Sequence, residues 1–146
     1  MKIEGMEVVV VGHFEIVGKP AAFMLIAEGA TVTVCHHMTR LVATHTRQAD
    51  VVLVVVGVPG LLTADMVKPG AAVIDIGINQ VTDADGTTRI IGDAATAGVA
   101  EIASWTTPVP GGVGPVTVSM LMPNAAIAFE KQIDIGWISM SRPLAS

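Results

Sequence analysis

Two glycines and a proline follow the first run of valines in the chain, within the segment from Gly12 to Pro20. Glycines at such a place allow a tight turn and a close approach of the backbone to a ligand. If a helix follows, the unpaired N–H groups of its first turn offer a binding site for a diphosphate. The usual dinucleotide fingerprint is G-x-G-x-x-G, whereas this segment has glycine only at Gly12 and Gly18. A tight strand-to-helix turn without a ligand is therefore the alternative.

A second segment rich in proline and glycine runs from Pro108 to Pro115. Prolines fix φ and glycines free it, so this segment is predicted to be a loop and not a helix or a central strand. Such a loop suits a flat ligand that approaches the backbone. A rigid turn that caps a following helix near Thr117 is the alternative, and both interpretations can hold.

Four residues suggest a metal site, namely Cys35, His36, His37 and His45. Adjacent residues on a strand point to opposite faces, so His36 and His37 are not expected to share one ion. The chain also lacks the paired Cys-x-x-Cys or His-x-x-x-His spacing of zinc sites. We therefore expect no metal site, and we expect these histidines to be solvated or to lie at the edge of a cofactor.

The elements that would position these segments are short apolar runs, each of which ends in glycine or a polar residue. They cover residues 8–11, 31–35, 51–56 and 72–76. Their β-branched composition predicts strands that are buried on both faces. Helices are expected over residues 18–29, 38–48 and 61–68. The alternation predicts an α/β fold with βαβ units, a Rossmann-like, doubly wound and mainly parallel sheet.

The second half of the chain gives weaker signals. Asp83 to Gly86 is predicted to form a turn, and residues 89–92 are predicted to return as an edge strand. A last helix is expected over residues 117–131, where Pro123 should kink the helix or start a second one. Residues 134–146 give no clear signal. We expect a single domain over residues 1–133, followed by a C-terminal tail.

Composition excludes several classes of protein. The 146 residues are 51% apolar and 14% charged, which fits one folded domain and not a disordered chain. The net charge is −5, the 8 Lys and Arg residues are scattered, and only 3% of residues are aromatic, so we expect no nucleic-acid partner. The longest apolar stretch, from Val51 to Val58, is far shorter than the ~20 residues of a membrane span. A single cysteine and no secretory signal indicate a cytoplasmic protein.

Four segments taken together, at residues 12–20, 35–39, 75–79 and 107–117, closely resemble the methylenetetrahydrofolate dehydrogenase/cyclohydrolase family. They occur in the same order and with matching gaps, over residues from about 4 to 130. The resemblance is to the C-terminal, cofactor-binding domain of that family. It implies that the complete enzyme transfers a hydride from 5,10-methylenetetrahydrofolate to NAD(P)⁺ and then hydrolyses the methenyl product.

The resemblance also implies roles for individual residues. The cofactor-binding residues would be Gly12, His13, Phe14, Ile16, Val17, Gly18, His36, His37, Gly57, Gly77, Ile78 and Thr117. The loop on the substrate side would contain Pro110, Gly111, Gly112, Val113 and Gly114. Within these sets, Gly57 would line the adenosine side of the groove and Ile78 would lie at the nicotinamide.

The chain departs from the family pattern where the family holds the 2′-phosphate of NADP. The family usually has Gly-Arg-Ser in the first loop and Cys-His-Ser after the second strand, and here His13, Phe14 and His37 stand at the Arg and Ser positions. An imidazole is mostly neutral at pH 7, and a phenyl ring has no hydrogen-bond donor. No Asp or Glu ends the second strand to bind a ribose 2′-hydroxyl, as in NAD enzymes. We expect reduced affinity for NADP, and the preference between NAD and NADP stays open.

The catalytic Lys and Tyr of the family belong to an N-terminal domain that is absent from this sequence, which contains no Tyr. We therefore assign no catalytic residue to this chain. Three interpretations follow. The chain is a cofactor domain that works with a catalytic domain, which would also provide the folate site; or it is a stand-alone dinucleotide-binding module or degenerate paralogue; or it is a structural unit for dimerisation, since family members pair through this domain.

Overall fold

A computed structural model describes residues 2–140 of the chain, with side chains described for residues 2–133. The chain forms two compact units, one that ends at Val113 and one that begins at Gly114. The strands are β1 (Glu7–Val11), β2 (Thr31–Cys35), β3 (Val51–Val54), β4 (Ala72–Asp75), β5 (Asn79–Thr82), β6 (Thr88–Ile91) and β7 (Trp105–Thr106). The helices are α1 (Gly18–Ala27), α2 (Val42–Thr46), the 3₁₀ turn η1 (Ala64–Met66), α3 (Thr96–Ile102) and α4 (Val113–Met140).

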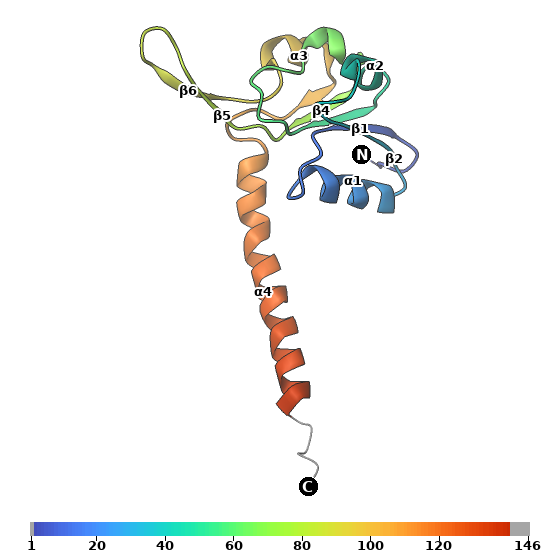
Figure 1. Cartoon of the computed structure of the whole chain (residues 1–146), viewed down its shortest axis with the longest axis vertical. Coiled ribbons are helices and arrows are strands. Elements are labelled where there is room, and N and C mark those ends of the chain that lie inside the picture. Colours follow the sequence, from blue (N-terminus) through green and yellow to red (C-terminus); the bar gives the residue numbers. More distant parts are fainter. Residues whose placement is uncertain (1, 141–146) are drawn as a thin grey trace. The chain divides into compact units, whose positions relative to one another are not determined.

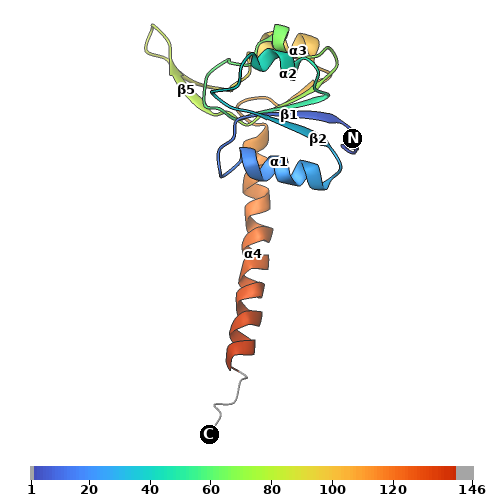
Figure 2. The same ribbon diagram turned by 45° about the vertical axis from the view of Figure 1, so that its right-hand side comes forward.

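The first unit is built on a five-stranded parallel sheet with the order β2-β1-β3-β4-β7. Helix α1 covers one face of this sheet, whereas α2 and α3 lie on the other face (Figures 1 and 2). The chain order reverses at β1, because β2 lies on one side of it and β3 on the other. The expected Rossmann-like, doubly wound parallel sheet is confirmed.

The buried valines of the strands divide between the two faces because successive side chains of a strand point in opposite directions. Val9, Val52 and Val73 belong to the core under α2, η1 and α3, which also contains Leu62 and Val99. The alternate strand residues belong to the core under α1; they include Val8, Val10, Val51, Leu53 and Ala72. The continuous valine runs of β1 and β3 are therefore buried on both sides, as the sequence predicts.

The strand at residues 88–91 does not join the main sheet. β6 pairs only with β5, in an antiparallel hairpin that forms a second, two-stranded sheet and extends away from the five-stranded sheet (Figures 1 and 2). The predicted turn is present, because the N–H of Gly86 donates to the carbonyl of Asp83 at 2.9 Å and the N–H of Thr87 donates to Oδ1 of Asp85 at 2.8 Å. The edge strand expected over residues 89–92 is thus one strand of a separate hairpin.

Two predicted helices are much shorter than expected. The helix expected over residues 38–48 is reduced to α2, and the helix expected over residues 61–68 is reduced to the three residues of η1. Leu62 explains the second difference, because its N–H donates to the carbonyl of Asp93 at 3.0 Å and its carbonyl accepts from Ala95 at 2.9 Å. These bonds use the backbone groups that a helix would need. Helix α3 and strand β7 were not predicted.

The second unit contains helix α4, which is longer than the predicted helix at both ends. It begins at Val113, inside the segment that the sequence predicts to be a loop through Pro115, and it continues through residues 134–140, where the sequence carries no clear signal. A proline is tolerated in the first helical turn, because the N–H that it lacks would have no partner there. Pro123 lies inside α4 and does not end it.

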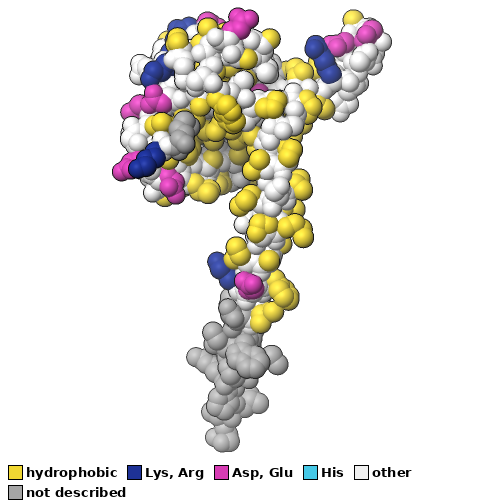
Figure 3. All heavy atoms as spheres, turned by 180° about the vertical axis from the view of Figure 1, so that it is seen from behind, with side chains coloured by type: hydrophobic (Ala, Val, Ile, Leu, Met, Phe, Trp, Pro, Cys, Tyr) yellow, Lys and Arg dark blue, Asp and Glu magenta, His cyan; other side chains and the backbone are white. Residues whose placement is uncertain are grey.

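Exposed apolar side chains follow α4 over the part whose side chains the structure describes, up to residue 133 (Figure 3); among them are Val118, Leu121 and Phe129. Within residues 2–140, no helix combines the length and the apolar character that crossing a bilayer demands.

Candidate nucleotide-binding site

The loop after β1 depends on two glycines that lie against the backbone. Gly12 has a φ of +126°, and a Cβ at this residue would lie 2.2 Å from the carbonyl oxygen of Val55, just beyond β3. A Cβ at Gly18 would lie 2.1 Å from the carbonyl oxygen of Gly12. Only glycine therefore fits at these two positions without a shift of the backbone, and the loop folds back closely on itself.

The loop leads directly into the N-terminus of α1. The residue before the helix, Val17, has no side-chain oxygen, and no side chain caps this end of the helix. The partial positive charge of the helix N-terminus therefore has no side-chain acceptor. Ile16 is 90% exposed beside it, and Lys19 is paired with Glu15. This end of α1 can accept an anionic group of a ligand.

Three imidazole rings meet beside this loop, from segments that follow two neighbouring strands. The ring centroid of His13 lies 5.0 Å from that of His36 and 5.9 Å from that of His37, and the last two are 5.8 Å apart. The ring of Phe14 stacks on His13 at 6.0 Å. We call His13, Phe14, His36 and His37 the ring cluster.

The two adjacent histidines of the ring cluster do not behave as neighbours on a strand. β2 ends at Cys35, so His36 and His37 lie beyond the strand and their rings approach each other. The expectation that they point to opposite faces is wrong for this reason. Nδ1 of His36 accepts a hydrogen bond from the N–H of Met38 at 3.1 Å. In the described part of the chain, no group of three His, Cys, Asp or Glu residues is arranged to hold a metal ion.

A fully buried aspartate, Asp93, binds the backbone just after β3. Its Oδ2 accepts hydrogen bonds from the N–H groups of Val56 at 2.6 Å and Gly57 at 2.9 Å. Its Oδ1 accepts from the side-chain amide of Asn79 at 2.8 Å. Three N–H donors thus offset the cost of removing this carboxylate from water.

A second buried aspartate, Asp75, binds the backbone just after β4. Its Oδ1 accepts from the N–H groups of Gly77 at 2.9 Å and Asp93 at 3.0 Å, and its Oδ2 accepts from Ala94 at 2.8 Å. Neither Asp75 nor Asp93 was identified from the sequence. The available signal was an acidic residue inside a buried apolar run, at Asp75, because such a residue must find hydrogen-bond donors.

The segment rich in proline and glycine is connected to Asp75 through Thr107. The N–H of Asp75 donates to Oγ1 of Thr107 at 2.7 Å, and this hydroxyl lies 3.2 Å from the carbonyl oxygen of Asp75. The following loop covers residues 108–112, with a φ of +99° at Gly111. A Cβ at Gly112 would lie 2.4 Å from the carbonyl oxygen of Pro108, so this loop is also tightly folded.

The structure brings most of the predicted site residues to one edge of the main sheet. The last residues of β1, β2, β3 and β4 lie side by side, because Val11 pairs with Cys35 and Val54, and Val54 pairs with Asp75. The segments that contain Gly12, His36, Gly57 and Gly77 therefore leave the sheet at the same edge. Ile78 follows, with its side chain 71% exposed. Among the predicted residues, Val113 is the first residue of α4, and Gly114 and Thr117 belong to the second unit.

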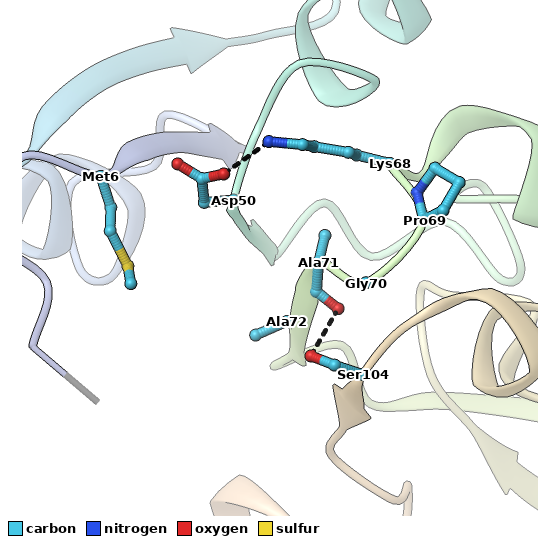
Figure 4. Close-up of a pocket in the computed structure, with 8 residues that line it drawn as sticks. All are labelled: Met6, Asp50, Lys68, Pro69, Gly70, Ala71, Ala72 and Ser104. Carbon is cyan, nitrogen blue, oxygen red and sulfur yellow. Dashed lines mark hydrogen bonds and ion pairs between the residues drawn. The ribbon is translucent and has the colours of Figure 1, made fainter.

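A cavity of about 310 Å³ lies at the opposite edge of the sheet (Figure 4). It is lined by residues that precede the strands, including Met6, Asp50, Ala71 and Ser104. Nζ of Lys68 lies 2.6 Å from Oδ1 of Asp50, and this hydrogen bond holds the pKa of the Asp50 carboxyl below its usual value. The cavity is separate from the loops at the carboxyl ends of the strands, where doubly wound sheets bind their ligands.

A parallel sheet with helices on both faces and glycine loops at the carboxyl ends of its strands defines a Rossmann-type dinucleotide-binding domain. The family model for the tetrahydrofolate dehydrogenase/cyclohydrolase NAD(P)-binding domain matches residues 1–133. The chain belongs to this family, as the resemblance in its sequence predicts, and it is the NAD(P)-binding domain.

Known relatives agree with this assignment. The chain is 70% identical over 137 residues to "Bifunctional protein FolD 3" of Roseobacter denitrificans. The aligned residues make up 94% of this chain and 47% of that relative. The structure of the bifunctional FolD of Campylobacter jejuni matches with a TM-score of 0.83 and 44% identity, over 90% of this chain and 45% of that one. The FolD of Trypanosoma brucei, solved as a complex with NADP and an inhibitor, matches with a TM-score of 0.83 and 43% identity. This match covers 91% of the present chain and 46% of the Trypanosoma brucei chain. The chain spans about half the length of these relatives.

Proposed function

We propose that this chain binds the diphosphate of NAD(P) between the loop at residues 12–18 and the N-terminus of α1. The observation that carries the proposal is the close packing of Gly12 and Gly18 against backbone carbonyls, where a Cβ would lie 2.2 and 2.1 Å away. This packing folds the loop backbone tightly against the start of α1, and no side chain caps that end of the helix. The residues present therefore fit a dinucleotide, which would supply the hydride acceptor.

The other loops at this edge would receive the two ends of the cofactor. Gly57 would lie at the adenosine side, and Gly77 and Ile78 at the nicotinamide. The substrate-side loop at Pro110, Gly111 and Gly112, continued by Val113 and Gly114, would lie against nicotinamide and folate, with Thr117 nearby. The family supports these positions, and the shared sheet edge supports those of Gly57 and Gly77.

The ring cluster would contact the ribose 2′ position of the adenosine. In doubly wound folds, a residue after the second strand commonly binds the ribose 2′-hydroxyl or the 2′-phosphate, and His36 and His37 occupy that place. An imidazole lacks the permanent charge and the planar set of five N–H donors of an arginine, so we expect weaker NADP binding than an Arg and Ser set would give.

The chemistry of the complete protein would be hydride transfer from 5,10-methylenetetrahydrofolate to NAD(P)⁺, with hydrolysis of the methenyl product. The groups at this edge of the chain bind and orient the cofactor. We assign no proton-transfer residue among them, because Asp75 and Asp93 are buried and each accepts three hydrogen bonds from N–H donors, and Glu15 is paired with Lys19. A catalytic domain would supply the proton transfer and the rest of the folate site. Relatives about twice as long as this chain support this division.

We further propose a cytoplasmic homodimer. The exposed apolar side chains of Phe23, Met24 and Ile26 on α1, and those of α4, support burial against another protein surface. The single cysteine supports a reducing compartment. A degenerate paralogue that acts only through dimerisation is the second candidate, and the replacement of the usual 2′-phosphate ligands by the ring cluster favours it.

Isothermal titration calorimetry of the full chain with NAD⁺ and with NADP⁺ tests the dinucleotide site. We expect micromolar binding of at least one cofactor, and loss of that binding in Gly18→Ala. Gly98→Ala is the matched control, because a Cβ at Gly98 meets only the Cβ of Ala64, at 3.5 Å. If neither cofactor binds the unmodified chain, the dimerisation candidate is preferred, and sedimentation velocity then measures the assembly directly. Addition of a family catalytic domain, followed by an assay of methylenetetrahydrofolate oxidation, tests the complete activity.

A further inference from the structure

Asp75, Asp93 and Thr107 form one continuous hydrogen-bonded network across the carboxyl edge of the sheet. Asp93 holds the backbone at Val56 and Gly57, and its own N–H donates to Asp75. Asp75 holds the backbone at Gly77, and its N–H donates to Thr107, directly before the loop at residues 108–112. One network therefore joins the three loops that follow β3, β4 and β7.

The network is buried and contains no ion pair with Lys or Arg among the described residues. Asp93 is 0% exposed, Asp75 is 1% exposed and Thr107 is 7% exposed, so none of them offers a side chain to a large ligand. In the part of the chain that the structure describes, neither carboxylate forms an ion pair with Lys or Arg. Each one instead accepts three hydrogen bonds from N–H donors of fixed position. Hydrogen bonds restrain the distance and the direction between their partners, which an apolar contact does not, so this arrangement restrains the backbone of the loops.

We propose that Asp75 and Asp93 are positioning residues for the NAD(P) site, which act by fixing the relative places of the loops that contain Gly57, Gly77 and Gly111. This inference rests on the proposed function, because it assumes that these loops contact the cofactor. The two aspartates do not touch the cofactor themselves. Their effect on binding passes through the backbone that they hold.

Asp93 accepts a hydrogen bond from the side chain of Asn79, so the role of Asp93 can be tested by exchanging these two residues. In Asp93→Asn, the carboxamide oxygen can still accept from Val56 and Gly57, but its NH₂ group then faces the NH₂ group of Asn79. Two donors in contact exclude each other, so either the loop shifts or the Asn79 amide turns over and loses its donation to the carbonyl of Ile91. The exchange variant Asp93→Asn with Asn79→Asp restores a donor against an acceptor at the same place.

The experiment is isothermal titration calorimetry of the full chain with the cofactor that binds the unmodified protein more tightly. Stoichiometry and Kd are measured separately, so that loss of folded protein is distinguished from loss of affinity. Asp93→Asn is expected to raise Kd at least about tenfold with unchanged stoichiometry, which corresponds to the loss of about one charged hydrogen bond. The exchange variant is expected to recover most of the affinity. Asp65→Asn, whose carboxylate is 72% exposed, is the matched control and should leave Kd unchanged.

A second variant keeps the test valid if Asp93→Asn does not fold. Thr107→Val removes only the hydroxyl that accepts from Asp75, and it should raise Kd by about three- to tenfold. An unchanged Kd in both variants at full stoichiometry, or a fall in stoichiometry alone, would overturn the inference and leave the proposed function intact. Absence of binding by the unmodified chain would overturn the proposed function, and the inference with it.

Discussion

Gly92 lies directly against the carboxylate of Asp75. A Cβ at Gly92 would lie 1.9 Å from Oδ2 of Asp75, the oxygen that accepts the N–H of Ala94 at 2.8 Å. The same relationship holds between Gly77 and Asp93, where a Cβ would lie 2.3 Å from Cγ. Each buried carboxylate therefore reaches its N–H donors because a glycine leaves room for it.

We expect Gly92→Ala to destabilise the chain, because the new methyl group must displace the Asp75 carboxylate from its donors. The free energy of unfolding should fall by about 2 kcal/mol or more, as measured by urea unfolding followed by circular dichroism. Gly98→Ala in α3 is the control and should raise stability by about 0.5–1 kcal/mol, because alanine is the better helix former. Equal effects at the two positions would contradict the packing described for Gly92.

Restoration of the usual family residues should change cofactor preference. The variant with His13→Arg, Phe14→Ser and His37→Ser should tighten NADP⁺ binding by about 1.5–3 kcal/mol, through charge-assisted hydrogen bonds to the 2′-phosphate, with a smaller effect on NAD⁺. Calorimetric titration of both cofactors measures the difference. Met38→Arg adds a charge at a nearby side chain that is 72% exposed, and it controls for general electrostatic attraction. An equal gain for both cofactors would show that the ring cluster does not contact the 2′ position.

The ion pair between Asp50 and Lys68 should make stability depend on acid pH. The hydrogen bond from Lys68 lowers the pKa of Asp50, and a further hydrogen bond from the N–H of Glu7 acts in the same direction. A lowered pKa in the folded state stabilises the protein above the ordinary Asp pKa of about 3.9, and this contribution is lost as pH falls through the folded value. Asp50→Asn should therefore lower Tm at pH 7, and the difference from the unmodified chain should shrink below about pH 4. A difference in Tm that stays constant from pH 7 to pH 3 would count against this pairing, and Glu101→Gln is the matched exposed control.

The thiol of Cys35 should be unreactive in the folded chain. Cys35 is completely buried at the end of β2, and desolvation raises its pKa, so both access and thiolate formation are suppressed. A thiol-specific chromogenic reagent at pH 8 should react slowly with the native chain and rapidly, with one equivalent, after unfolding in guanidinium chloride. Rapid labelling under native conditions would show that this end of β2 opens easily. Cys35→Ser gives the background rate.

Several predictions from the sequence failed where tertiary contacts compete with local preference. The helix expected over residues 61–68 has apolar residues at suitable spacing, but Leu62 is 1% exposed and bridges to Ala94, which draws this segment into an extended conformation. Strand β7 has only two residues, so no period of apolar residues marks it. Asp75 stands in an apolar run, but its partners and those of Asp93 could not be predicted, because the donors come from segments as far apart as Val56 and Ala94.

The sequence by itself determined the parallel sheet and the edge to which we assign the proposed site. Runs of β-branched residues ending in glycine predict buried parallel strands, and parallel strands necessarily bring their carboxyl ends to one edge. Tertiary structure alone decided how the loops at that edge are held, because hydrogen bonds between Asp93, Asp75 and Thr107 join segments that are distant in the chain. It also decided that His13, His36 and His37 meet, since side chains beyond the end of a strand no longer follow its alternation.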